Sequence, residues 1–102
     1  MVIVIWETQL KAGAEKEGLR LTRQIWAEMT QKAGYLSHTL LVDEDTPGHL
    51  LVVSKWSSRQ ITDALRDTYT HAEPVLRLVP LLERPRNRWV FFEDAGPSAV
   101  GN

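Results

Sequence analysis

The chain has 102 residues, of which 43% are hydrophobic, and its formal net charge is -1 at pH 7. This length and balance are typical of one small globular domain, and the scattered Lys and Arg residues offer no basic stripe for nucleic acid. The absence of cysteine excludes disulfides, thiolate metal sites and cysteine nucleophiles. The N-terminal segment is apolar for only a few residues and has no basic leader, so we expect a cytoplasmic protein without a signal peptide or a membrane span.

The first predicted element is a strand over residues 2–10, VIVIWETQL. It begins with β-branched residues, which are enriched in strands. Alternate side chains of a strand point to opposite faces, so Val4 and Trp6 lie on one face and Ile3 and Ile5 on the other. Because both faces are apolar at this end, we expect each face of the strand to be covered.

The most regular helical pattern lies within residues 11–34. Acidic residues stand near its start and Lys32 near its end, which is the arrangement that the helix dipole favours. Gly34 is the predicted stop. The positions at helical spacing that would face a core are Leu19, Thr22, Trp26, Met29 and Ala33.

Two further strands, over residues 35–42 and 49–56, flank the sequence DEDTPG. Its Pro-Gly pair and acidic cluster predict a turn, so the two strands should form an antiparallel hairpin. His38 has apolar neighbours on its face, and we expect it to be a hydrogen-bonded residue of the core or of a dimer contact. His49 follows the turn, and we expect it to be exposed to solvent.

Trp56 ends the third predicted strand directly before two serines. Ser57 and Gln60 have the spacing of a capping box, which predicts a second helix over residues 57–67. In that arrangement Trp56 precedes the cap and packs against Ile61 as a hydrophobic staple. The alternative is that Trp56 lines a cavity at the end of the strand, and the two roles are compatible.

The segment TYTHAEPVLRLVPLL, residues 68–82, carries competing helix signals. Thr70 and Glu73 have capping-box spacing, but Pro74 favours a helix that starts slightly later, because proline suits the first turn. Pro80 limits the length of that helix. We therefore expect a helix here with either of two starts.

The last predicted strand, NRWVFFE over residues 87–93, precedes a segment over 94–102 that we expect to be a flexible tail. The domain thus spans residues 1–93, and its element order is β, α, β, β, α, β. That order predicts an α+β fold of the ferredoxin-like type, with one antiparallel four-stranded sheet and helices on one face. Since both faces of the strands are apolar, we expect the uncovered face to pair with a second copy.

Taken in order, the segments KAG, KAGYLSHTLLVD, SKWSS, TH and LVPLL resemble the antibiotic biosynthesis monooxygenase superfamily of dimeric α/β barrels, over nearly the whole chain from Val2 to Glu93. The resemblance implies a homodimer whose open sheet faces form a barrel, with an apolar pocket in each protomer between sheet and helices. The family includes cofactor-free oxygenases of anthrones and quinols, haem-degrading enzymes and signal-molecule isomerases. Trp56 and His71 match positions that recur in the pockets of the oxygenase and haem-degrading branches.

Two of the candidate site residues are assigned catalytic roles. His71 is the predicted general base, because imidazole accepts protons near neutral pH and a place in the first turn of a helix would keep it neutral. The alternative for His71 is an exposed loop residue. Trp56 would pack against an apolar substrate while its indole N–H donates one hydrogen bond.

Four further residues are candidates for substrate binding. Trp6 shares a face with the apolar start of its strand and would form an aromatic wall. Trp26 fits the same cavity, although an aromatic residue at helical spacing is more often part of the core. Tyr69 or Arg77 would donate to a substrate oxyanion. The alternative for Tyr69 is a staple residue at a helix start, and the alternative for Arg77 is a position on the solvated face of a helix.

The sequence therefore predicts a cofactor-independent monooxygenase that oxidises a hydroxylated aromatic, such as a polyketide anthrone or a quinol, with O2. Once deprotonated, such a substrate is itself the electron donor to dioxygen, so the protein need supply only a base, a dry cavity and oxyanion donors. No metal site is expected, since the three His residues lie in separate elements.

Two alternatives remain open. One is a haem-binding or haem-degrading protein with His71 as the axial ligand. Haem-degrading relatives carry an Asn on the first strand where this chain has Trp6 or, if the register slips by one, Glu7, which favours the cofactor-free prediction. The other alternative is a non-catalytic dimeric module that binds a small molecule, and a pocket filled by its own Trp side chains would favour it.

Overall fold

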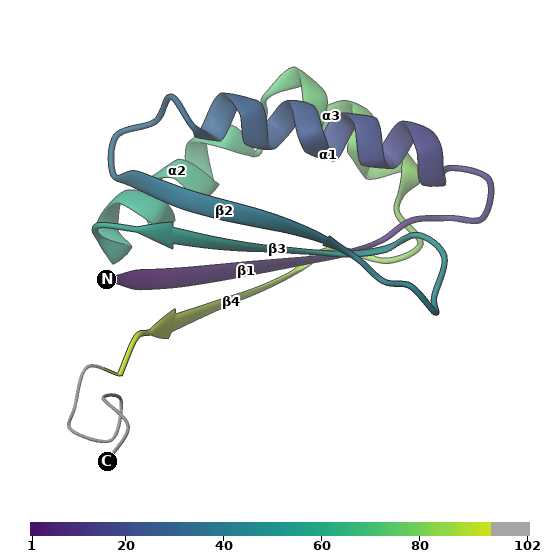
Figure 1. Ribbon diagram of the computed structural model, residues 1–102. Coiled ribbons are helices and arrows are strands. Elements are labelled where there is room, and N and C mark those ends of the chain that lie inside the picture. Colours follow the sequence, from purple (N-terminus) through teal and green to yellow (C-terminus); the bar gives the residue numbers. More distant parts are fainter. Residues whose placement is uncertain (95–102) are drawn as a thin grey trace, which may run out of the picture.

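The computed structural model describes residues 1–94. Within them the chain alternates strands and helices, and a short 3-10 helix follows the last α-helix (Figure 1). The predicted flexible tail lies, apart from its first residue, outside the described residues. In chain order the elements are β1 (Val2–Gln9), α1 (Glu15–Met29), β2 (Tyr35–Val42), β3 (His49–Trp56), α2 (Arg59–Tyr69), α3 (Glu73–Leu78), η1 (Val79–Leu81) and β4 (Asn87–Phe92).

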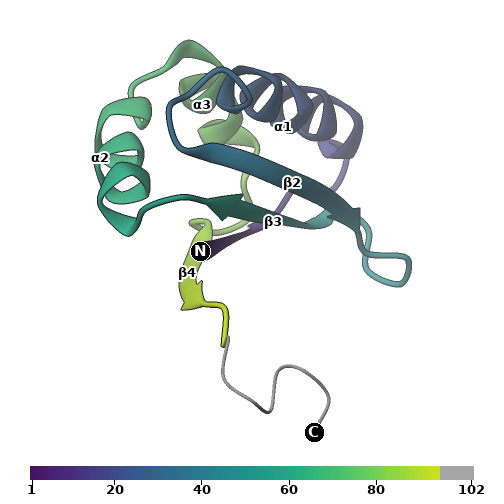
Figure 2. The same ribbon diagram turned by 60° about the vertical axis from the view of Figure 1, so that its left-hand side comes forward.

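The four strands form one sheet in the order β2, β3, β1, β4, and each neighbouring pair is antiparallel. Helices α1 and α3 lie above this sheet, and α2 lies beside the end where β3 finishes (Figures 1 and 2). In the described part of the chain the opposite face of the sheet carries no helix. This is the ferredoxin-like α+β fold that the element order predicts.

The second crossover contains two α-helices, α2 and α3, which correspond to the two helical segments predicted over residues 57–67 and within 68–82, although the predicted element order counted them as one. Helix α2 ends at Tyr69, and Thr70 is its C-cap rather than the cap of a new helix. Helix α3 starts at Glu73 with Pro74 in its first turn, where the missing N–H of proline is not needed. The later of the two predicted starts is therefore the one adopted.

Strand alternation places the core on the helix side of the sheet. Val4 of β1 is 2% exposed and Val52 and Trp56 of β3 are 3% exposed each, and all three lie on the same side as Trp6. The face predicted for the first strand is thus confirmed. Helix α1 covers this face with Gly18, Leu21, Thr22, Ile25, Trp26 and Met29, which are buried at helical spacing.

Helix α1 ends earlier than the sequence predicted. It stops at Met29 with Thr30 as its C-cap, so Lys32 lies beyond the helix and not in its last turn. The chain then turns at Gly34, which has a φ of 84° that favours glycine. The Gly34 carbonyl accepts the backbone N–H of Ser57 at 2.9 Å, which ties this turn to the end of β3.

The cap of α2 also differs from the prediction by one residue. The N-cap is Ser58, whose hydroxyl oxygen accepts the N–H of Ile61 at 3.4 Å. The predicted capping box from Ser57 to Gln60 is therefore wrong, and so is the staple geometry that depended on it. Trp56 lies two residues before the cap, and its side chain is buried under the helices.

The uncovered face of the sheet is apolar at its centre. Ile5 of β1 lies in register between Val53 of β3 and Trp89 of β4. Trp89 is 43% exposed and Phe91 is 50% exposed. Small soluble domains seldom leave so many large apolar side chains together in water. This open face, as we call it from here on, consists at its centre of Ile3, Ile5, Leu41, Leu51, Val53, Trp89 and Phe91.

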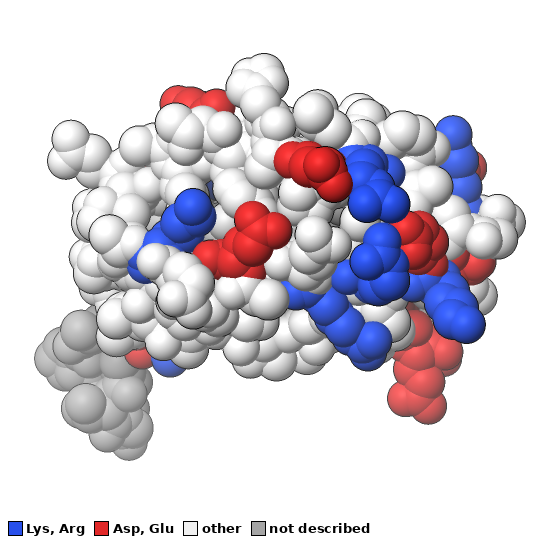
Figure 3. Space-filling model, turned by 90° about the horizontal axis from the view of Figure 1, so that it is seen from above, with Lys and Arg blue, Asp and Glu red and all other residues white. Residues whose placement is uncertain are grey.

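The helix-bearing side is polar in contrast. Seen from above, its acidic and basic side chains intermingle (Figure 3). Arg20 pairs with Glu17 at 2.7 Å on α1, and Arg77 pairs with Glu73 at 3.6 Å on α3. No α-helix within residues 1–94 has both the length and the apolar character needed to cross a membrane.

Candidate functional site

A cavity lies between the helix side of the sheet and the three α-helices. Its volume is about 80 Å³, several times the roughly 10–15 Å³ that a water molecule needs. Aliphatic side chains from β1, α1, α2 and α3 form part of its wall. The aromatic lining residues are Trp6, Trp26, Trp56 and Tyr69, and the polar ones are Thr62, Arg66, Thr70, Arg86 and Arg88.

The aromatic wall brings together residues from four elements. Trp6 comes from β1, Trp26 from α1, Trp56 from β3 and Tyr69 from the last turn of α2. Trp26 and Trp56 are 6% and 3% exposed, so their rings are fixed by the core. The four aromatic residues that the sequence singled out therefore meet at one cavity, and they leave it open instead of filling it.

The indole N–H of Trp56 is not available to a ligand. It donates to the Ser54 hydroxyl oxygen at 2.9 Å, and that hydroxyl donates to the backbone carbonyl of Val4 at 2.9 Å. Ser54 is fully buried. The predicted donor role of Trp56 toward a substrate is thus replaced by an internal hydrogen bond, and Trp56 contributes the surface of its ring.

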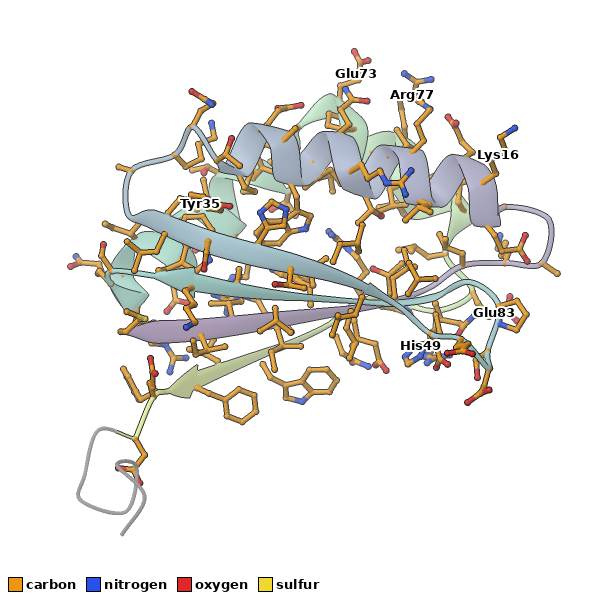
Figure 4. The ribbon with its side chains drawn as sticks, in the orientation of Figure 1. Lys16, Tyr35, His49, Glu73, Arg77 and Glu83 are labelled. Atoms are coloured by element: carbon orange, nitrogen blue, oxygen red, sulfur yellow. The ribbon has the colours of Figure 1, made fainter. Side chains whose placement is uncertain are left out.

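A second group of rings supports Trp56 from behind. The Tyr35 ring meets Trp56 edge to face at 5.7 Å between centroids, and the Tyr35 hydroxyl is hydrogen-bonded to His38 Nδ1 at 2.7 Å. The His38 ring in turn lies 5.3 Å from Trp26. His38 is thus half-buried and hydrogen-bonded, and its ring packs beside Trp26 at the edge of the core. Figure 4 places Tyr35 on the helix side of β2.

Two arginines from the end of the chain complete the cavity. The Arg86 guanidinium lies over the Trp6 ring at 4.7 Å from its centroid, and that of Arg88 lies at 5.8 Å. Arg88 also donates to Asp63 at 2.8 Å. Arg86 is half-buried, and burial lowers the pKa of its guanidinium from the ordinary value. This end of the cavity is therefore positively charged.

Sequence reasoning missed Arg86 and Arg88, which stand in the segment ERPRNRW before and within β4. The signal was their spacing of two, which places both on one face if the chain is extended. What decides their position is the register of β4 on β1, in which Arg88 lies opposite Trp6. A single sequence does not reveal that pairing.

The structure does not bring His71 or Arg77 to the cavity. His71 is exposed in the loop between α2 and α3, two residues before α3 begins, so the predicted place in a first helical turn is wrong. Arg77 points away from the sheet beside Glu73 (Figure 4), and its side chain is 53% exposed. Arg77 therefore lies on the solvated face of its helix, which was the alternative that the sequence offered.

Tyr69 lines the cavity with its ring but directs its hydroxyl elsewhere. The hydroxyl donates to Glu28 Oε1 of α1 at 2.8 Å. Burial, followed by this hydrogen bond, raises the pKa of Tyr69 above its ordinary value. Because the phenol stays neutral, Tyr69 is a poor base. Its hydroxyl hydrogen is already donated to Glu28, so it is not available to a ligand.

The family model for antibiotic biosynthesis monooxygenase matches residues 1–74. The chain belongs to this family. A search of curated protein sequences finds no significant match.

Solved structures of the antibiotic biosynthesis monooxygenase family share the fold. A crystal structure of an antibiotic biosynthesis monooxygenase is 29% identical over 95% of this chain and 100% of that chain, with a TM-score of 0.70. SnoaB, a cofactor-independent oxygenase from Streptomyces nogalater, is 16% identical over 94% of this chain and 95% of that chain, with a TM-score of 0.79. At that identity the likeness to SnoaB shows the fold alone.

The uncovered side of this family member's sheet carries a polar cluster that the sequence did not predict. His49 lies between two carboxylates, with Nε2 at 2.7 Å from Glu7 and Nδ1 at 2.7 Å from Asp43. Asn87 donates to the second Glu7 oxygen at 2.8 Å. The expectation that His49 is exposed is therefore wrong: its side chain is 22% exposed. Its labelled position in Figure 4 is at the end of the sheet away from the termini.

This cluster makes stability depend on pH. Asp43, then Glu7, raises the pKa of His49 above its ordinary 6.5, so the stabilisation from charged His49 is complete below pH 6.5 and is lost as the pH rises through the raised value. Asn87 and His49 lower the pKa of Glu7 below 4.5, and that stabilisation is lost as the pH falls through the lowered value. The cluster thus stabilises most between pH 4.5 and 6.5.

We expect the difference in unfolding free energy between the wild type and His49→Gln to be largest in that window and to shrink toward higher pH. Urea unfolding at a series of pH values measures this difference. Arg59→Gln, which removes a largely exposed partner of Asp63, is the control and should show no such window. A difference that stays constant from pH 5 to pH 9 would contradict the assignment of charge to His49.

Proposed function

We propose that this member of the antibiotic biosynthesis monooxygenase family is a cofactor-independent monooxygenase that oxidises a reduced, hydroxylated aromatic molecule with O2. The observation that carries the proposal is the cavity, which is open, walled by Trp6, Trp26 and Trp56, and positive at one end. Such a lining suits a flat aromatic ring with an acidic hydroxyl group. Membership of the antibiotic biosynthesis monooxygenase family supports oxygenase chemistry, and SnoaB, a cofactor-independent oxygenase, shares the fold.

The chemical step needs few protein groups. A deprotonated anthrone or quinol transfers one electron to O2, and the resulting superoxide and aryloxyl radical combine to form a carbon–oxygen bond. The peroxide anion formed in this way takes up one proton from solvent and becomes a hydroperoxide. For an anthrone, loss of water from the hydroperoxide then breaks the O–O bond and leaves a carbonyl, so one oxygen atom enters the product and the other leaves as water. The protein's part is to exclude bulk water, orient the ring and stabilise the oxyanion.

The residues take somewhat different roles from those that the sequence predicted. Trp6 and Trp56 line the cavity and, as the sequence predicted, are the proposed walls on either side of the ring. Arg86 and Arg88 replace Arg77 as the cationic groups that would face an oxyanion, because Arg77 lies outside the cavity. His71 remains a predicted base that the geometry does not support, since its exposed ring is absent from the lining although its neighbour Thr70 contributes to it.

Oxygen uptake with a panel of anthrones and hydroquinones tests the proposal. We expect saturable uptake, and a fall in kcat/KM of about 2-fold to 13-fold in Trp6→Leu, since one aromatic pair contributes roughly 0.5–1.5 kcal/mol. Trp89→Leu makes the same change on the open face and should alter kcat/KM by less than about twofold. Absence of uptake above the buffer rate with every substrate of the panel would count against oxygenase activity.

His71→Gln belongs in the same assay. General-base catalysis contributes about 10²–10⁴-fold to rate. We expect kcat to stay within about threefold of the wild type, because His71 does not line the cavity. A loss of 100-fold or more would restore the base role that the sequence predicted and would require the loop after α2 to turn inward on substrate binding.

No observation favours the two alternative functions. A haem-binding protein with His71 as its axial ligand would need that imidazole in the cavity, and His71 is not among the lining residues. A non-catalytic module was expected to fill its own pocket with Trp6, Trp26 and Trp56, yet these side chains leave open space between them.

We further propose that the chain forms a homodimer through the open face. The centre of this face is apolar on all four strands, and no helix within residues 1–94 covers it. A small domain buries only about 60–70% of the surface of its unfolded chain, so a second copy would add a core of useful size. The polar cluster around His49 lies at the rim of the same face and would help to fix the relative orientation of the two copies.

A further inference from the structure

The cavity between the sheet and the helices is small for a polycyclic ligand. Its volume is about 80 Å³. Pockets that enclose a drug-sized ligand usually measure about 300–1,000 Å³, and an engineered apolar cavity of about 150 Å³ in another protein holds one benzene molecule. Because this cavity opens to solvent, one aromatic ring can be seated with its substituents toward the mouth. A second fused ring would have to displace a wall.

The walls on the core side are held in place by contacts behind them. Trp26 and Trp56 are 6% and 3% exposed. The indole N–H of Trp56 donates to Ser54 at 2.9 Å, and the Tyr35 ring packs against Trp56 edge to face. The His38 ring lies behind Trp26 with its centroid 5.3 Å away. Protein interiors are close-packed, so neither indole can retreat without moving the side chains that support it.

The opposite wall belongs to helix α2, which is tied to the rest of the fold near both of its ends. Leu65 lies in the middle of this wall. Near the start of α2, Asp63 accepts a hydrogen bond from Arg88 of β4 at 2.8 Å. In the last turn, the Tyr69 hydroxyl donates to Glu28 of α1 at 2.8 Å. Charge-assisted hydrogen bonds are the stronger ones, and outward movement of α2 would have to break them.

We propose that the cavity is specific for a hydroxylated aromatic molecule with a single ring, such as a hydroquinone, and that it excludes the three fused rings of an anthrone. The inference rests on the proposed function for the hydroxylated aromatic character of the ligand, and it narrows that class by size. The limit is set by Trp26 and Trp56 on the core side and by Leu65 and Tyr69 on the side of α2.

Calorimetric titration in oxygen-free buffer measures binding without turnover. The probes are hydroquinone, 1,4-dihydroxynaphthalene and anthrone, which contain one, two and three fused rings. If apolar area alone decided the affinity, each added ring would make binding tighter, because more apolar surface would leave water. A cavity of fixed size reverses this order, so the order of the three affinities is diagnostic.

We expect hydroquinone to bind at least about fivefold more tightly than 1,4-dihydroxynaphthalene. Forcing extra carbon atoms into a packed interior lowers affinity by a factor of about 5 to 150. Anthrone should show no saturable binding. The informative quantity is the ratio of two affinities measured on one protein, since a fraction of molecules that cannot bind lowers both by the same factor.

Leu65→Ala removes part of the wall on the side of α2 and should relax the size limit. Leu65 is half-buried, so its truncation costs less stability than that of a fully buried leucine. We expect the ratio of affinities to shift toward 1,4-dihydroxynaphthalene by at least about fivefold. Leu76→Ala is the matched control, because Leu76 is an exposed leucine of α3 outside the cavity, and it should leave the ratio unchanged. If Leu65→Ala does not fold, the order of affinities in the wild type decides the question.

Three results would overturn the inference: affinities that rise from hydroquinone to anthrone in the wild type, no saturable binding of hydroquinone, or a ratio that Leu65→Ala leaves unchanged. The outcome is separate from that of the oxygenase proposal. The expected order of affinities, together with no oxygen uptake on any substrate of the panel, would overturn the oxygenase proposal alone. Oxygen uptake that is faster with anthrone than with hydroquinone, with affinities in the same order, would overturn the size limit alone.

Discussion

Trp56→Ala is expected to lower the free energy of unfolding by about 3–5 kcal/mol, the usual range for removal of a large buried aromatic side chain. Trp56 is 3% exposed and meets the edge of Tyr35, so truncation leaves a space that joins the existing cavity. The buried Ser54 hydroxyl would also lose the indole N–H that it now accepts. Stability of a domain of this size is about 5–15 kcal/mol, so the variant would retain little margin.

Urea unfolding at 25 °C measures this loss, and two companion variants separate its causes. Trp56→Phe keeps a six-membered aromatic ring and removes the N–H together with the rest of the five-membered ring, so its loss should be smaller than that of Trp56→Ala. Ser54→Ala removes the hydroxyl and leaves the indole N–H without its partner, which costs about 1–3 kcal/mol. A loss below about 1 kcal/mol in Trp56→Ala would show that Trp56 is not part of the core.

Of the two roles that the sequence left open for Trp56, staple residue and cavity wall, the structure supports the second. Strand alternation sends Trp56 to the helix side of β3, where any large side chain must contact the helices. The helix cap lies at Ser58 and not at Ser57, so Trp56 does not occupy the staple position. Its ring forms part of the wall of the cavity. The strand pattern was predictable; the one-residue shift of the cap was not.

The fold and the aromatic part of the site follow from short-range patterns. The alternation of β1 placed Trp6 on the helix side, and the helical spacing of α1 placed Trp26 there as well. Both patterns depend on neighbouring residues in the chain, and a single sequence contains them in full.

The polar part of the site depends on contacts between distant segments. Arg86 reaches Trp6 only because β4 pairs with β1, eighty residues away in the chain. His49 meets Glu7 because β3 lies on the other side of the same strand. His71 was misplaced for a local reason: α3 starts at Glu73 with an Ala72 cap, so the loop holds His71 away from the helix start.

Ile5→Lys is expected to weaken the proposed homodimer by at least about 100-fold, while the folded monomer persists. Ile5 lies at the centre of the open face, between Val53 and Trp89. In a monomer a lysine there would extend its amino group into water, and the protein would keep its core on the helix side. In a dimer the same amino group would be buried between two apolar sheets without a carboxylate, which costs several kcal/mol.

Sedimentation equilibrium over a range of protein concentrations measures the dissociation constant, and circular dichroism checks that the variant is folded. Leu76→Lys is the control: Leu76 is 55% exposed on α3, on the helix side of the molecule, so it should leave the dissociation constant unchanged. A wild-type protein that stays monomeric at high concentration would contradict the proposed dimer. The cavity lies on the helix side of the sheet, away from the proposed dimer contact. If Ile5→Lys yields a folded monomer, measuring ligand binding to it shows whether the site is complete within one chain.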